Sequence, residues 1–113
     1  MPHIIVEYAQ NLDNSLDLKA LVRAVHEGAL RADLFEPEAI KVRAIAYSHY
    51  LVAGEVQDFI HLRVQILSGR SEPQKQHLSQ CLFESAESVA AAVHSLSVEV
   101  VDMDRFSYIK RTG

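Results

Sequence analysis

The residue with the clearest potential for chemistry is Pro2, which follows Met1 directly and leads at once into the apolar segment His3-Ile4-Ile5-Val6. Chain termini usually fray, so an apolar segment here predicts that Pro2 is held in a sheet. A small second residue favours removal of the initiator methionine, which would leave Pro2 with a free secondary amine. An ordinary α-amino group has a pKa of about 7.7–8.0, so this amine could move protons near neutral pH. Taken alone, such a proline is more often simply the first residue of a strand.

The elements that would position Pro2 begin with a strand, a helix and a second strand. Ile, Val and Tyr predict a strand over 2–8, and apolar residues at helical spacing predict a helix over about 15–31. Alternation returns over 40–52 and places Lys41 and Arg43 on the same strand face. The apolar stripe of the helix contains Leu18, Leu21, Val22, Val25 and Ala29.

The second half of the chain repeats this order. The sequence predicts a strand over 59–67, and Ser71 with Gln74 forms a capping box that begins a helix ending near His94. A strand over 97–103 follows, and residues 104–113 form a basic, aromatic tail. The apolar stripe of this helix contains Leu78, Leu82, Ala86, Val89 and Val93.

The two halves overlay at an offset of about 57 residues, which aligns His3 with His61 and Val42 with Val98. The chain is therefore interpreted as one α/β (α+β) domain, residues 1–113, built from tandem β-α-β units over about 2–52 and 59–104. Right-handed crossovers would make the strands of each unit parallel. The expected result is a four-stranded sheet with both helices on one face. The uncovered face carries apolar residues, which favours oligomerisation.

The composition is that of an ordinary globular protein, with 49% hydrophobic and 23% charged residues among 113. The net charge of −4 argues against nucleic acid as the main partner. No apolar run approaches the roughly 20 residues of a membrane span, and no signal peptide is evident. The single cysteine, Cys81, excludes an internal disulfide and favours a cytoplasmic location. No metal-ligand spacing surrounds it, and we expect no metal.

Three features together resemble the tautomerase superfamily: the Met1-Pro2 start, the β-α-β duplication and the segment Ile66-Leu67-Ser68-Gly69-Arg70-Ser71-Glu72-Pro73-Gln74-Lys75. This segment is similar to the Leu-x-Gly-Arg-Ser-x-x-Gln-Lys stretch of 4-oxalocrotonate tautomerase. The start, Met1-Pro2-His3-Ile4-Ile5-Val6-Glu7, looks most like the 5-carboxymethyl-2-hydroxymuconate isomerases, which have two units per chain. The resemblance covers about residues 2–104.

The resemblance implies a homotrimer with its sheets lining the inside, and Pro2 as the catalytic base. It implies that Arg43 and Arg70 bind substrate carboxylates, whereas Lys41 lies either at the rim of the site or on the solvated surface. Arginine forks hold carboxylates bidentately, and their charge would lower the pKa of the Pro2 amine. No metal or organic cofactor is required.

The two halves differ at the positions that would form a site. Leu12 stands where the second half has Arg70, Ile60 replaces the proline, and Glu99 replaces Arg43. We therefore expect one site per chain.

The activity that the resemblance implies is keto-enol isomerisation of an unsaturated 2-hydroxy polycarboxylate, 5-carboxymethyl-2-hydroxymuconate, in 4-hydroxyphenylacetate (homoprotocatechuate) catabolism. Two alternatives stay open: a phenylpyruvate-type tautomerase, and a trimeric binding module without activity. Tyr8, Tyr47 and Tyr50 would line the cavity or an interface. His3 and His61, equivalent by the repeat, are expected to have structural roles.

Overall fold

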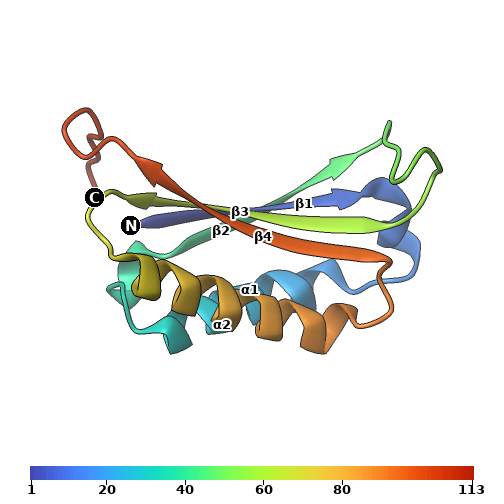
Figure 1. Ribbon diagram of the computed structural model, residues 1–113, viewed down its shortest axis with the longest axis horizontal. Helices are drawn as coiled ribbons and strands as arrows, with labels where there is room; N and C mark the ends of the chain where they lie inside the picture. The colour runs from blue at the N-terminus through green and yellow to red at the C-terminus, as the bar shows by residue number, and fades with distance from the viewer.

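In a computed structural model, which describes residues 1–113, a curved four-stranded sheet carries two helices on one of its faces (Figure 1). Each half of the chain supplies a strand, a helix and a second strand, as the sequence predicts. The elements are β1 (Pro2–Ala9), α1 (Leu18–Ala32), β2 (Lys41–Tyr47), β3 (Phe59–Leu67), α2 (Glu72–Ala90) and β4 (Ser95–Met103), with short 3-10 helices at Gln10–Asn14 and Pro37–Ala39.

The strand order β2-β1-β3-β4 confirms the tandem β-α-β interpretation. β1 pairs with β2 in parallel, β3 pairs with β4 in parallel, and the two units meet through the antiparallel pair β1 and β3. In that pair Ile5 lies opposite Arg63, and these two positions are equivalent in the repeat. An approximate two-fold axis therefore passes between them and relates one end of the sheet to the other.

The strand predicted over 40–52 is shorter in the structure. Tyr47, the last residue of β2, pairs with Ala9, the last residue of β1. β2 is an edge strand, so it has no partner once β1 turns into the 3-10 helix at Gln10–Asn14.

Side chains set both helix starts. Asp17 accepts a hydrogen bond from the Ala20 amide at 3.1 Å, so α1 begins at Leu18 rather than near Ser15. The predicted capping box of Ser71 and Gln74 is present at the start of α2. α2 ends at Ala90, earlier than predicted, and β4 begins at Ser95, opposite the first residue of β3.

The core lies between the sheet and the two helices, because alternate strand residues and one stripe of each helix face each other across that layer. Fully buried aliphatic side chains there are worth roughly 1.5–3 kcal/mol each relative to exposure. They include Ile4, Val6, Leu21, Val25, Ile60, Leu62, Val64, Ile66, Leu78 and Leu82.

The two helices are in tight contact at Gly28 of α1. A Cβ atom there would lie 2.8 Å from Ser85 Oγ and 3.0 Å from the Cys81 carbonyl oxygen. Arg31, one turn on, donates to the same two oxygens at 2.6 and 2.9 Å. Glycine is therefore required at this contact by space rather than by backbone conformation.

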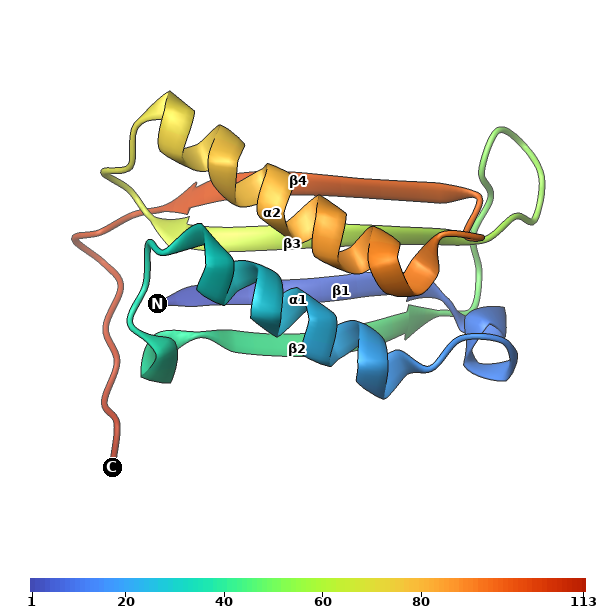
Figure 2. The same cartoon turned by 90° about the horizontal axis from the view of Figure 1, so that it is seen from below.

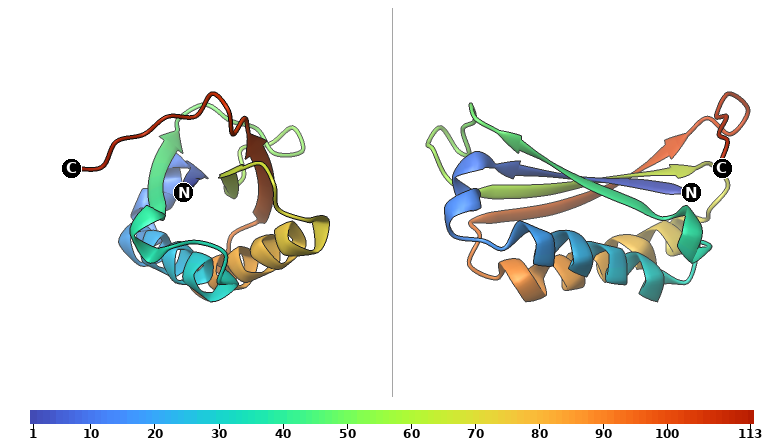
Figure 3. Two further views of the ribbon diagram at one scale, coloured as in Figure 1. Left: turned by 90° about the vertical axis from the view of Figure 1, so that its left-hand side faces the viewer. Right: turned by 180° about the vertical axis from the view of Figure 1, so that it is seen from behind.

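The other face of the sheet carries no helix (Figure 3). The strand registers place alternate residues of all four strands there, among them His3, Glu7, Lys41, Arg43, His61, Arg63 and Glu99. Ile45 and Tyr47 on this face are 50% and 39% exposed. Neither α1 nor α2 combines the length and apolar character needed to cross a membrane.

Candidate active site

Pro2 is the first residue of β1 and pairs with Ile66 in the middle of the sheet. Its side chain is fully buried on the helix side, so the prediction that the sheet holds this residue is confirmed. The N-terminus lies at the end of the sheet where α1 finishes and α2 begins (Figure 2). A proline fits this strand start because it has no N–H to leave unpaired.

Arg70 reaches the same end of the molecule from the turn between β3 and α2. Gly69 makes that turn with φ +124°, a conformation that side-chain-bearing residues rarely adopt. The Arg70 guanidinium donates to the Leu34 carbonyl at 2.7 Å and lies 5.6 Å from the centre of the Phe35 ring. Since Phe35 packs against the core, these two contacts hold the Arg70 guanidinium against the segment that follows α1.

Lys41 and Arg43 project from β2 onto the helix-free face, as the alternation predicts. Lys41 lies opposite His3 and donates to the Ala39 carbonyl at 3.0 Å. Arg43 lies opposite Ile5, and its guanidinium contacts His3 Nδ1 at 3.1 Å. His3 thus lies between the N-terminal residue and Arg43.

Positive charge is concentrated around the chain start. Burial lowers the pKa of the α-amino group, here that of Met1, and the charges of Lys110, Lys41 and Arg70 lower it further. Burial also lowers the pKa of His3, with contributions from Arg43 and Lys41. Both groups therefore lose their protons at a lower pH than they would in free solution.

The structure brings three of the four predicted site residues into one electrostatic neighbourhood: Pro2, Lys41 and Arg70. Arg43 joins it through His3. Sequence reasoning missed Lys110 and Tyr108, although the basic, aromatic character of the tail was visible. Lys41, Arg43, Arg70 and Lys110 form no ion pair with any carboxylate. Three of these unneutralised cations, Lys41, Arg70 and Lys110, thus act on the chain start, and Arg43 contacts the neighbouring His3, in a protein whose net charge is −4.

The positions that correspond in the repeat to Arg43 and Arg70 have different chemistry. Glu99 occupies the position that corresponds to Arg43, and its carboxylate accepts a hydrogen bond from His61 Nε2 and lies 3.9 Å from Arg63. The bond from His61 holds the pKa of Glu99 below its usual value. Leu12, which corresponds to Arg70, is 2% exposed and belongs to the core. No concentration of unpaired cations forms here.

The three tyrosines with open roles gather around the far end of β1. Each hydroxyl donates to a nearby polar side chain: Tyr8 to Asp13 at 2.8 Å, Tyr47 to Glu7 at 2.9 Å and Tyr50 to Asn11 at 2.8 Å.

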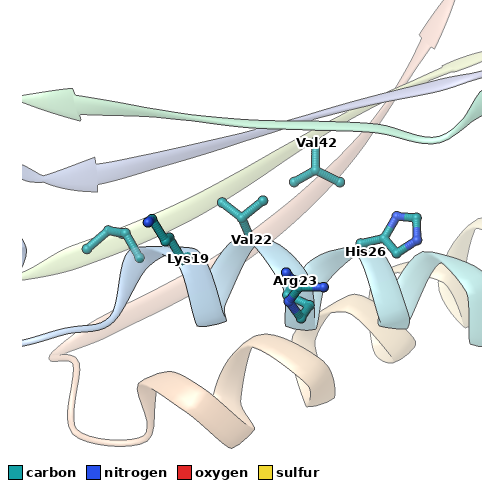
Figure 4. A pocket seen from close by; sticks show the side chains of 6 residues that line it. Lys19, Val22, Arg23, His26 and Val42 are labelled. Atoms are coloured by element: carbon teal, nitrogen blue, oxygen red, sulfur yellow. The ribbon is translucent and has the colours of Figure 1, made fainter.

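A separate groove of about 540 Å³ lies between the outer side of α1 and β2 (Figure 4). Lys19, Arg23 and His26 of α1 and Val42 of β2 contribute to its lining. None of the residues predicted for the site lines this groove, so we do not assign the chemistry to it.

A sequence profile described as 5-carboxymethyl-2-hydroxymuconate isomerase matches residues 2–112. The 5-carboxymethyl-2-hydroxymuconate Delta-isomerase of Escherichia coli is 28% identical over 95 residues, which cover 82% of this chain and 75% of that protein. The crystal structure of a 5-carboxymethyl-2-hydroxymuconate isomerase from Deinococcus radiodurans R1 superimposes with a TM-score of 0.84 at 29% identity, over 99% of this chain and 90% of that one. A fused 4-OT wild type symmetric trimer has the same fold, with a TM-score of 0.83 at 17% identity over 98% and 93% of the two chains.

Proposed function

Because this chain belongs to the 5-carboxymethyl-2-hydroxymuconate isomerase family, we propose that it isomerises 5-carboxymethyl-2-hydroxymuconate, with the amine of Pro2 as the base once Met1 is removed. The observation that carries the proposal is the chain start itself: Pro2 is paired into the sheet, and burial together with the charges of Lys110, Lys41 and Arg70 lowers the pKa of the amino group there. A base works best when its pKa lies near the working pH. Burial and three cations shift an amine in that direction.

The reaction moves one proton and requires no net change in the protein. The unprotonated Pro2 amine takes the proton of the 2-hydroxyl group, and the electron pair moves along the conjugated chain. The resulting dienolate takes the proton back from Pro2 at a carbon, which leaves the ketone and the neutral amine. Negative charge on the dienolate oxygen is stabilised by nearby cations, an effect typically worth about 10²–10³ in rate.

The cations divide between holding the substrate and tuning the base. Arg70, fixed by Leu34 and Phe35, would bind one carboxylate in its planar fork. Arg43, which contacts His3 on the helix-free face, would bind a second carboxylate. Lys41 lies opposite His3 on the same face, at the rim of the proposed site.

The proposal includes a homotrimer with one site per chain, acting in the cytoplasm. A helix-free sheet face with exposed Ile45 and Tyr47 supports association of copies through this face. The fused 4-OT structure of the same fold is a symmetric trimer, which supports three subunits here. The contrast between Arg43 and Glu99, which are equivalent in the repeat, supports one site per chain.

The test is turnover by protein whose N-terminal residue is shown by mass spectrometry to be Pro2. Its activity should be measured on a tricarboxylate enol and on a monocarboxylate enol such as that of phenylpyruvate. We expect a much higher kcat/KM for the tricarboxylate, and a Pro2→Ala variant with unchanged fold but at least about tenfold lower kcat. Preference for the monocarboxylate would support a phenylpyruvate-type tautomerase instead. Absence of turnover of both would support a binding module.

A further inference from the structure

The C-terminal tail, residues 104–113, crosses the end of the sheet that holds the N-terminus. It leaves β4, passes the chain start and finishes beyond β2 (Figures 2 and 3). Near its origin, Arg105 donates to the Ser68 carbonyl through Nε at 3.0 Å and through a terminal nitrogen at 2.7 Å. A turn follows, closed by the Tyr108 amide and the Asp104 carbonyl at 3.2 Å. The tail is therefore anchored to the same turn between β3 and α2 that carries Arg70.

A second anchor joins the tail to the candidate site itself. The Tyr108 hydroxyl lies 3.0 Å from His3 Nε2, and the two rings meet edge to face with their centres 6.0 Å apart. Arginine can only donate hydrogen bonds, so the contact of Arg43 with Nδ1 makes that nitrogen the acceptor. The imidazole proton is then on Nε2 and is donated to Tyr108. Arg43, His3 and Tyr108 thus form one chain of hydrogen bonds from β2 to the tail.

These two anchors determine where Lys110 lies. It follows Tyr108 by two residues, so its Cα atom lies within about 7 Å of that of Tyr108, which is bonded to His3. Its charge also helps to lower the pKa of the amino group at the chain start, together with Lys41 and Arg70. Lys110 has no carboxylate partner in the protein. Like charges gathered at one end of the molecule repel one another, and an anion bound among them would relieve that repulsion.

We propose that Lys110 is a substrate-binding residue that holds a carboxylate of the polyanionic substrate, and that Tyr108, bonded to His3, is the positioning residue that brings it to the site. This inference rests on the proposed function, because it names a residue for the substrate class given there. It assigns the tail a role in selecting substrates with several carboxylates over those with one.

The first experiment compares Lys110→Gln with Arg111→Gln, which removes the neighbouring exposed cation of the same tail. A hydrogen bond to a charged group is worth enough that its loss should raise KM for the tricarboxylate by about tenfold or more. The comparison is made at a pH well above the acidic limb of the kcat/KM profile, where the base is already unprotonated in every variant. There the kcat value, and the kinetics with a monocarboxylate enol, should change little. Lys110→Arg, which keeps the charge, should retain most of the affinity. Equal KM values for Lys110→Gln and Arg111→Gln would overturn the inference.

Tyr108→Phe tests positioning, because it keeps the ring and removes only the hydroxyl that bonds His3. We expect a smaller rise in KM with little change in kcat, and no additional loss when Tyr108→Phe is combined with Lys110→Gln. Full additivity of the two changes would show that Tyr108 does not act through Lys110.

Calorimetric titration with propane-1,2,3-tricarboxylate separates this inference from the proposed function, because it requires no turnover. Binding that is weakened by Lys110→Gln and not by Arg111→Gln would support the role of the tail even in a protein that isomerises nothing. Equal binding by both variants, or absence of binding by the unmodified protein, would refute it.

Discussion

Whether Met1 is present should decide between an active and an inactive protein. In the unprocessed chain the nitrogen of Pro2 belongs to a tertiary amide, which has no basic lone pair. Removal of Met1 converts it into a secondary amine without breaking any hydrogen bond of the sheet, since β1 begins at Pro2 and proline has no N–H to donate. The two forms should therefore differ in chemistry and not in fold.

The size of the effect follows from the proposed role of Pro2 as general base. Such a group typically contributes about 10²–10⁴ in rate, which corresponds to roughly 3–5 kcal/mol of barrier at about 1.36 kcal/mol per factor of ten. The cations that remain in the unprocessed chain would still bind substrate, so KM should change less than kcat.

The assay is a matched pair prepared from one batch of protein. Protein produced with Met1 retained is measured before and after treatment with methionine aminopeptidase, with mass spectrometry to follow the loss of Met1. Loss of absorbance of the conjugated enol reports turnover, and thermal melting reports the fold. Equal kcat values in the two forms, with confirmed difference in mass, would refute Pro2 as the base.

The remaining predictions concern the cations and the helix contact. Arg70→Gln should raise KM for carboxylate substrates. It should also raise the pKa of the base by removing a nearby positive charge, so the acidic limb of the kcat/KM profile should move to higher pH. Arg70→Lys keeps the charge and should raise KM but leave the limb in place. An acidic limb that stays fixed in Arg70→Gln would contradict the electrostatic role. Gly28→Ala should lower the urea concentration at the midpoint of unfolding. Overpacking against Ser85 and Cys81 costs about 1–3 kcal/mol of stability, whereas the higher helix propensity of alanine returns only roughly 1 kcal/mol. The exposed neighbour change Glu27→Ala should stay within about 0.5 kcal/mol, and a stabilised Gly28→Ala protein would show that the helices can separate at no cost.

The sequence predicts the fold well where local chemistry decides it. The capping box at Ser71 and Gln74 fixes the start of α2, and the apolar alternation of β3 gives its bounds as observed. The end of β2 was misplaced because it depends on where its partner β1 ends, which is a property of strand pairing and not of the β2 residues.

The candidate site could be predicted only in part for a similar reason. Lys41 and Arg43 share a face because alternation is local, and the structure agrees. The contact of Tyr108 with His3 joins residues 105 positions apart and has no periodic pattern to reveal it. Lys110 owes its place to that single contact and to the Arg105 anchor, so no reading of the tail alone could have assigned it.

The approximate symmetry of the sheet explains why the second half does not duplicate the site. A repeat preserves backbone and core, and the buried aliphatic residues of β1 and β3 do match. The base in question, however, requires a chain terminus, which only one copy can have: Ile60 lies at the equivalent position with Phe59 before it in the same strand. Without a base, the proposed reaction gives no reason for carboxylate-binding cations at the equivalent positions. Glu99, bonded to His61 and close to Arg63, stands where Arg43 stands in the first half, so we expect polyanions to bind near Pro2 and not at the corresponding place in the second half.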